Sequence, residues 1–141
     1  MQEAIKEAQI ALFENEVPVG AVVVKDDRII ASAHNLCNSG NDPTLHAEIL
    51  ACKEAYRKLG SLDGCSLYVT LEPCAMCTGA MLHMHLPRLV YGAFDPSCGC
   101  CGSRIDLGDH WFDQSIETIG GVLEQDCADL LHTLFQNLRS E

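Results

Sequence analysis

Apolar and polar residues follow one another with two different periods along this chain, and the change of period predicts alternating helices and strands. In residues 3–15 the apolar positions recur at helical spacing between Glu and Lys, and Pro18 ends the pattern, so we expect a helix there. The β-branched run 19–25 and the apolar run 28–33 are separated by Asp26-Asp27, which predicts a β-hairpin.

The rest of the chain continues this alternation. Helices are expected over residues 46–59, 74–86 and 124–138. Strands are expected over residues 66–71, 88–94 and 116–119. Pro73 favours the start of the middle helix, since proline suits the first helical position. The resulting order, α-β-β-α-β-α-β-β-α, predicts a three-layer α/β/α fold in which a five-stranded, mostly parallel mixed sheet carries helices on both faces.

The length and hydropathy of the chain indicate one globular domain. Its 141 residues show no repeat or linker, so residues 1–141 are expected to form a single domain. The apolar runs are all shorter than the roughly 18 residues that a membrane helix needs. The first residues carry acids where an export signal carries bases. These features predict a cytoplasmic protein that does not bind membranes.

Charge and cysteine content narrow the possible functions. The formal net charge of -11 argues against broad, non-specific binding of nucleic acid, which requires Lys and Arg to neutralise phosphates. From residue 105 onward the chain contains eight acidic residues and only one basic residue, Arg139. Nine cysteines without an export signal favour metal ligands and buried free thiols over disulfides.

Two short motifs carry the candidate chemistry, His46-Ala47-Glu48 and Pro73-Cys74-Ala75-Met76-Cys77. Each is placed at the predicted start of a helix, where the helix dipole favours thiolates. Two thiolates and one imidazole supply three zinc ligands and leave the fourth tetrahedral position for water, as in catalytic zinc sites. Glu48 lies close to the expected metal without being a ligand, which suits a base that moves protons.

Each part of this pattern has a simpler explanation when it is taken alone. A Cys-x-x-Cys pair also occurs in redox sites and structural zinc sites, and a single His-Ala-Glu occurs by chance on helix surfaces. The combination of His-x-Glu with Pro-Cys-x-x-Cys is the signature of zinc deaminases. Cys98, Cys100 and Cys101 suggest a second metal site with His110 as an additional ligand, although free thiols in a loop explain them as well.

Longer stretches around these motifs resemble the bacterial tRNA-specific adenosine deaminases, which belong to the cytidine and deoxycytidylate deaminase superfamily. The similar stretches are residues 16–22, 41–49, 67–77 and 91–95. The resemblance implies a cytidine-deaminase-like fold, a homodimer with sites near the subunit interface, and a tRNA anticodon loop as partner. It implies hydrolytic conversion of the wobble adenosine, position 34, to inosine.

The resemblance also implies a role for individual residues. One Zn²⁺ per chain would be held by His46, Cys74 and Cys77, while Glu48 would transfer protons from water to N1 and then to the leaving amine. The substrate-binding residues would be Asn35 on the base, Val19 in the base pocket and Asp95 near the nucleotide backbone. An asparagine in a loop, a valine in a strand and an aspartate after a strand are also common structural residues.

The chain departs from this family where RNA contacts are expected. Ser97 replaces a frequent lysine, Phe94 replaces a frequent arginine, and the last helix lacks a basic cluster. These departures keep a second hypothesis open, deamination of a free base or nucleotide of the guanine or deoxycytidylate type. A third hypothesis, a zinc-stabilised binding domain without activity, leaves Glu48 without a purpose and predicts a fourth protein ligand.

Overall fold

The computed structural model describes residues 1–109 and 113–141, and its elements follow the predicted order. The helices are α1 (Gln2–Phe13), α2 (Ala47–Leu59), α3 (Ala75–His83) and α4 (Glu124–Ser140). The strands are β1 (Gly20–Lys25), β2 (Arg28–His34), β3 (Ser66–Leu71), β4 (Arg88–Ala93) and β5 (Glu117–Ile119). Most ends agree with the predicted ends within one or two residues. The exception is the C-terminal end of α3, which lies at His83 and not at residue 86. Pro73 precedes the N-cap Cys74 instead of occupying the first helical position.

The five strands form one mixed sheet in the order β2-β1-β3-β4-β5. β1 runs antiparallel to both of its neighbours, while β3, β4 and β5 pair in parallel. Four of these five strands therefore point the same way, which confirms the predicted mostly parallel sheet. The hairpin places β1 inside the sheet and leaves β2 at the edge.

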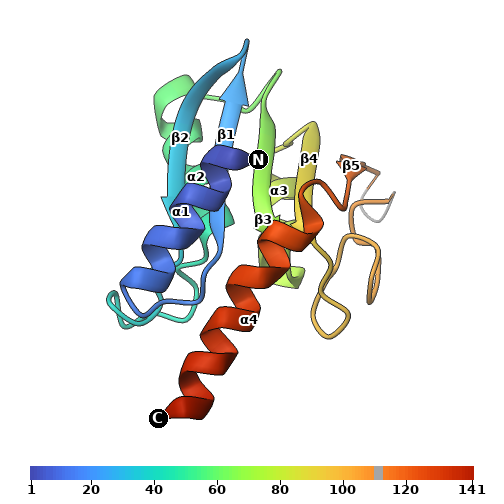
Figure 1. The fold of residues 1–141 in the computed structure, drawn as a ribbon. Helices are drawn as coiled ribbons and strands as arrows, with labels where there is room; N and C mark the ends of the chain where they lie inside the picture. The colour runs from blue at the N-terminus through green and yellow to red at the C-terminus, as the bar shows by residue number, and fades with distance from the viewer. Residues whose placement is uncertain (110–112) are drawn as a thin grey trace.

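Helices cover both faces of the sheet and complete the three layers. In Figure 1, α1 and α4 lie in front of the sheet and α2 and α3 lie behind it, in agreement with the contacts between these elements. The alanines that face the sheet from α1, Ala4, Ala8 and Ala11, are fully buried, as their spacing predicts. Their small side chains let α1 approach β1 so closely that a Cβ added to Gly20 would lie 2.0 Å from the carbonyl oxygen of Ala4.

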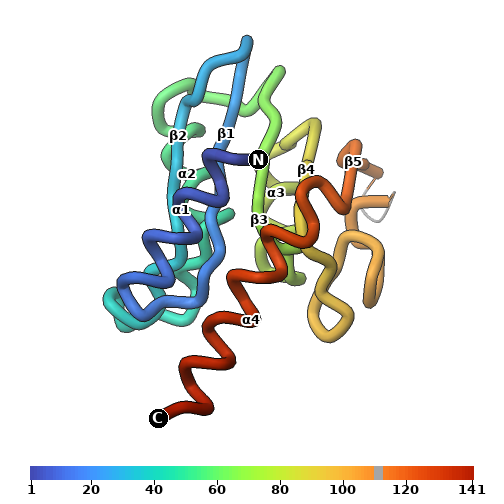
Figure 2. Tube along the Cα trace, in the orientation of Figure 1, coloured from blue at the N-terminus to red at the C-terminus, as the bar shows by residue number. Residues whose placement is uncertain are grey.

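The last helix is less buried than its apolar face suggests. Leu130, Leu131 and Leu134 are half-buried, whereas Phe135 and Leu138 are 54% and 59% exposed. The traces in Figures 1 and 2 show why, since the C-terminal half of α4 extends beyond the end of the sheet. Among the described residues no helix is both long and apolar enough to cross a membrane.

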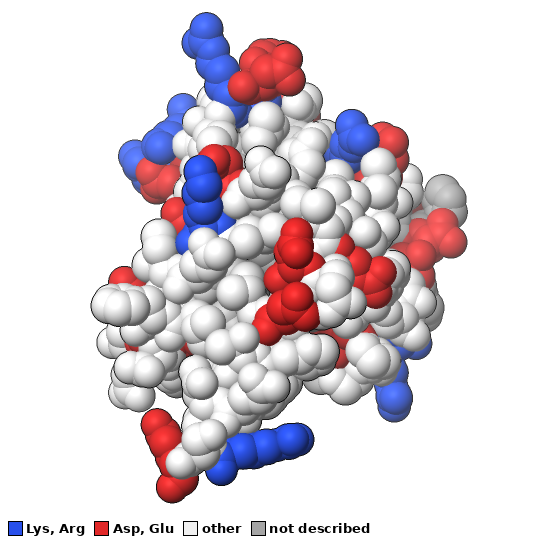
Figure 3. Space-filling model, viewed as in Figure 1, with Lys and Arg blue, Asp and Glu red and all other residues white. Residues whose placement is uncertain are grey.

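Acidic side chains gather on the face that carries α4. Figure 3 shows this group in the middle of the view, over the helix whose first turns contain Glu124, Asp126 and Asp129. A surface of this charge repels phosphates. Any contact with a polyanion is therefore expected elsewhere on the molecule.

Candidate zinc site

The two motifs meet because their helices begin at the same edge of the sheet. β2 and β3 point the same way, so the loop after β2 and the end of β3 lie beyond the same ends of the strands, where sites form in α/β folds. His46 is the N-cap of α2, and Cys74 is the N-cap of α3. Both have extended backbone conformations, and neither side chain makes a capping hydrogen bond to its helix.

The side chains of His46, Cys74 and Cys77 converge on one point. Nδ1 of His46 lies 3.7 Å from Sγ of Cys74 and 3.4 Å from Sγ of Cys77. Zn–N bonds of about 2.0–2.1 Å and Zn–S bonds of about 2.3 Å at a tetrahedral angle separate nitrogen from sulfur by about 3.6 Å. All three donor atoms lie within 4.8 Å of one another. The residues thus fit one zinc ion in size and in ligand type.

The two cysteines of this group are a coupled pair. Interaction with the side chain of Cys77 lowers the pKa of Cys74 to about 5, although burial acts in the opposite direction. The same interaction, with burial, raises the pKa of Cys77. A metal bound by both sulfurs requires both thiols to be deprotonated, so metal binding releases protons.

Glu48 lies in the first turn of α2, beside this group. It is only 5% exposed, and burial raises the pKa of its carboxyl group, while contact with the Cys77 thiol and the charge of His46 act against that rise. A carboxylate with a raised pKa accepts a proton more readily near neutral pH, as a general base must. In the described part of the chain, the three-ligand group is the one cluster of potential metal ligands, and Glu48 is not a member of it.

Asn35 and Val19 lie together at the entrance to α2. Oδ1 of Asn35 accepts a hydrogen bond from the backbone N–H of Ala47 at 2.8 Å, and the backbone N–H of Asn35 donates to the carbonyl of Val19 at 3.2 Å. Asn35 is thus held one residue from His46. Val19 is 4% exposed and belongs to the hydrophobic core. Both have the structural role that their residue types suggest. Hydrogen bonds link Val19 to Asn35 and Asn35 to Ala47, the residue that follows His46.

Asp95 follows β4 and organises the loop after that strand. Its Oδ1 accepts hydrogen bonds from the backbone N–H of Ser97 and Cys98, both at 3.1 Å, and from the hydroxyl of Ser97 at 2.8 Å. This is the turn chemistry expected of an aspartate at the end of a strand. The backbone N–H of Asp95 in turn donates to the buried carboxylate of Glu72, a residue whose role sequence reasoning missed.

The cysteines of this loop do not form a second cluster within the described residues. Sγ of Cys101 contacts the Thr78 hydroxyl at 3.3 Å, and Sγ of Cys100 donates to the carbonyl of Cys98 at 3.4 Å. Burial raises the pKa of Cys100, and it raises that of Cys101 to about 12, so both are thiols at neutral pH. His110, the suggested additional ligand, lies outside the described residues.

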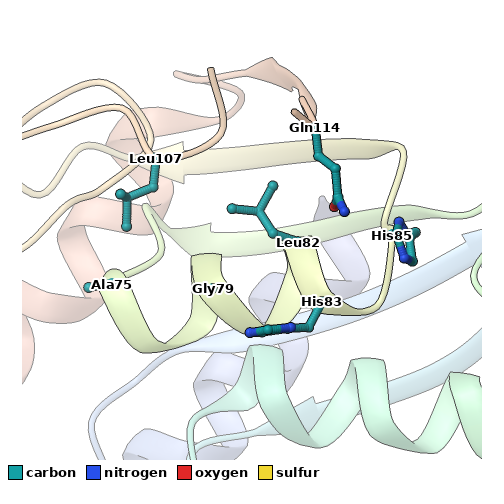
Figure 4. Close-up of a pocket in the computed structure, with 7 residues that line it drawn as sticks. All are labelled: Ala75, Gly79, Leu82, His83, His85, Leu107 and Gln114. Atoms are coloured by element: carbon teal, nitrogen blue, oxygen red, sulfur yellow. The ribbon is translucent and has the colours of Figure 1, made fainter. Parts of the chain in front are cut away.

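A mostly apolar cavity of about 350 Å³ lies beside α3. Figure 4 shows its lining, which comes from α3, the turn after it and two loops: Ala75, Gly79, Leu82, His83, His85, Leu107 and Gln114. Its lining includes none of the three metal-site residues. The metal site and this cavity are therefore distinct features of the same helix.

Fold and site together define a zinc-binding deaminase domain. Residues 1–93 match the family described as the cytidine and deoxycytidylate deaminase zinc-binding region. That range contains Glu48 and all three residues that could hold the metal.

Comparison with individual relatives shows to which branch of this family the chain belongs. The tRNA-specific adenosine deaminase of Bacillus subtilis (strain 168) is 45% identical, with 100% of this chain and 89% of the relative covered. A solved structure from a study of A-to-I editing by tRNA:A34 deaminases superposes with a TM-score of 0.84 at 40% identity, over 93% of this chain and 97% of that chain. Guanine deaminase from Bacillus subtilis, also 40% identical, gives a TM-score of 0.63 over 66% of this chain and 61% of that chain. The chain belongs to the tRNA-specific adenosine deaminases.

Proposed function

We propose that this protein hydrolyses adenosine to inosine at the wobble position of a tRNA anticodon loop, with release of ammonia. The observation that carries the proposal is the group of His46, Cys74 and Cys77 beside the buried carboxylate of Glu48. It occurs in a chain that is 45% identical to a tRNA-specific adenosine deaminase over nearly the full length of both. Guanine deaminase from Bacillus subtilis matches a smaller part of the chain with a lower TM-score, and guanine deaminase from Nitrosomonas europaea matches 94% of the chain with a TM-score of 0.82 but at only 23% identity.

His46, Cys74 and Cys77 hold the metal in this proposal, and Glu48 moves the protons. A bound zinc ion lowers the pKa of a water molecule enough for it to attack a purine at C6 near neutral pH. Glu48 takes a proton from the attacking water and delivers it to N1 of the base. It then transfers the second proton to the leaving amino group. Its raised pKa, caused by burial, suits a group that must both accept and release protons.

The substrate is placed by residues around the start of α2 and the end of β4. The side-chain oxygen Oδ1 of Asn35 accepts a hydrogen bond from the backbone N–H of Ala47. The side-chain NH₂ group of Asn35 is therefore left to donate to an acceptor atom of the base. Val19 supplies an apolar wall next to Asn35. Asp95 approaches the nucleotide backbone from the loop after β4, where it accepts hydrogen bonds through Oδ1. A carboxylate there suits a sugar hydroxyl, which can donate to it, better than a phosphate.

A second copy of the chain is the proposed partner at the face of α3. The cavity beside α3 is apolar, and the side chains of Ala75, His83 and His85 at its rim are exposed. A Cβ added to Gly79 would meet no atom within 4 Å, so a Gly79→Phe monomer should fold while its ring fills the cavity. We expect the parent protein to sediment as a dimer and Gly79→Phe as a monomer, with Gln136→Phe on α4 as control. A monomeric parent protein would contradict the proposal.

We also propose that the enzyme acts in the cytoplasm, because a tRNA substrate is found there.

The decisive experiment is a comparison of substrates with the zinc-loaded protein. We expect inosine to form in a tRNA anticodon stem-loop with adenosine at the wobble position, and no inosine in the same RNA with guanosine there. The apparent affinity should fall as salt is raised, because phosphate contacts release counterions. Release of ammonia from free guanine or deoxycytidylate, without reaction on the RNA, would replace this function by the small-molecule alternative.

A further inference from the structure

Glu72 joins two parts of the molecule that are distant in sequence. It directly follows β3, and its side chain is 2% exposed. Its carboxylate accepts hydrogen bonds from the backbone N–H groups of Asp95 at 3.1 Å, Cys101 at 3.1 Å and Ser103 at 3.0 Å. The hydroxyl of Ser103 donates to it as well. Both ends of the loop formed by residues 95–103 thus converge on one buried side chain.

A carboxylate is the side chain that satisfies this arrangement. Four donors point at Glu72, two at each oxygen, and an ionised carboxylate offers two acceptor oxygens and no donor. A glutamine would place a donating NH₂ group against at least one backbone N–H. Because an unsatisfied buried polar group is costly, the loop would have to shift away from a glutamine.

The same loop is attached to the chain immediately before the first cysteine ligand. The backbone N–H of Cys100 donates to the carbonyl of Pro73 at 2.9 Å, and that of Glu72 donates to the carbonyl of Ala93 at 2.9 Å. A Cβ added to Gly99 would lie 2.4 Å from the carboxyl group of Glu72, so the loop backbone packs directly on this side chain. The position of the loop relative to Cys74 therefore depends on Glu72.

We propose that Glu72 is a positioning residue for the RNA substrate. It holds loop 95–103 in the shape that presents Asp95 at a set distance from the metal site. This role rests on the proposed function. Glu72 itself does not touch the substrate. Loss of the carboxylate should weaken binding of RNA, which uses the loop, and leave zinc binding and the chemical step nearly unchanged.

Three variants test the role from both sides of the contact. Glu72→Gln keeps the size of the side chain and removes the charge, whereas Gly99→Ala leaves Glu72 in place and forces the loop away from it. Ser103→Ala removes one donor at an exposed position, so it tests the contact even if Glu72→Gln does not fold. Glu54→Gln, on the exposed side of α2, is the control for loss of a carboxylate.

Hydrogen exchange and kinetics are measured on each zinc-loaded variant. In Glu72→Gln we expect faster exchange at the backbone amides of Asp95, Cys101 and Ser103, with unchanged protection of the β3 and β4 amides. KM for the anticodon stem-loop should rise about 10-fold in Glu72→Gln and Gly99→Ala, and less in Ser103→Ala, while kcat stays within about 2-fold. Zinc content should remain at one per chain in all of them.

The outcomes separate this proposal from the proposed function. Unchanged exchange of the loop amides in both Glu72→Gln and Gly99→Ala, or an unchanged KM, would overturn the positioning role while the deaminase activity stands. Loss of zinc together with kcat would instead place Glu72 in the metal site and also overturn it. If the parent protein does not react with the RNA, the proposed function fails, and with it the substrate part of this proposal, whatever the exchange data show.

Discussion

Nδ1 of His46 lies 3.4 Å from Sγ of Cys77, although 31 residues separate them in the chain. Each belongs to the start of a helix, and the two helices begin beyond the same edge of the sheet because β2 and β3 run in the same direction. The metal site is thus a consequence of strand direction. The experiments below test the site and the parts of the fold that hold it.

Replacement of Glu48 should separate chemistry from metal binding. We expect Glu48→Gln to retain one zinc per chain and the parental melting temperature, and to lose about 10²- to 10⁴-fold in kcat, the usual contribution of a positioned acid or base. Deamination of the anticodon stem-loop and elemental analysis measure the two properties. Activity within a factor of ten of the parent would remove Glu48 from the proton transfer.

Loss of a ligand should affect both metal content and stability. His46→Ala removes one of three donors, so we expect zinc to be lost on dialysis against a weak chelator that does not strip the parent protein. Because zinc binds the folded chain, the variant should also lose the metal-dependent rise in melting temperature. A fully metallated His46→Ala protein would contradict the ligand assignment. The control is His132→Ala, since His132 is exposed on α4 and lies outside the metal group.

The contacts of His34 should make stability depend on pH. Nδ1 of His34 lies 2.7 Å from the carboxylate of Glu7 and Nε2 lies 2.9 Å from that of Glu14. Burial lowers the pKa of His34, but the two carboxylates outweigh it, so the pKa in the folded protein is raised above 6.5.

A raised folded pKa fixes the sign of this effect. The stabilisation is complete below about pH 6.5, the pKa of an unperturbed histidine, and is lost as the pH rises through the higher folded value. We expect a contribution on the order of 1 kcal/mol, reduced by the exposure of Glu14. Urea unfolding of His34→Gln at pH 6 and pH 9 should show the difference from the parent only at the lower pH. An equal difference at both values would rule out the charged pair.

Two glycines should respond oppositely to the same substitution. A Cβ at Gly20 would lie 2.0 Å from the carbonyl oxygen of Ala4 and 2.6 Å from the amide nitrogen of Ala8, both backbone atoms of α1. Gly20→Ala should therefore force α1 from the sheet and cost about 3 kcal/mol or more. Gly79→Ala, where the added carbon meets nothing within 4 Å, should be neutral or stabilising. Thermal unfolding of both variants measures the contrast, and similar melting temperatures would contradict it.

Most of the secondary structure could be predicted because it depends on short-range periodicity. The buried alanines of α1 and the strand Ser66–Leu71 appear where the pattern placed them. Pro73 lies two positions before the first helical residue, Ala75, and not at that position as predicted, because cap geometry depends on how the chain turns after β3. The exposure of Phe135 and Leu138 was also unpredictable, since helical spacing identifies an apolar face and not what lies against it.

The candidate site also contains residues that the sequence could predict and residues that it could not. His46, Cys74 and Cys77 could be chosen as ligands from residue type and local spacing, and the structure brings them together. Glu72 and Glu16 could not be chosen, because nothing local distinguishes a buried glutamate from an exposed one. Glu16 is 1% exposed and accepts the backbone N–H groups of Asn38 at 2.9 Å and Ser39 at 2.7 Å in the loop before α2.

By itself the sequence determined which residue types suited to metal binding and proton transfer stand together in short motifs, and in which order helices and strands follow, since both depend on residues close together in the chain. Only the tertiary structure decided which loops are held beside the metal site and by which carboxylates, because those contacts join segments such as Glu72 and Ser103, 31 residues apart. Periodicity carries no information over that distance, whereas strand direction and packing do.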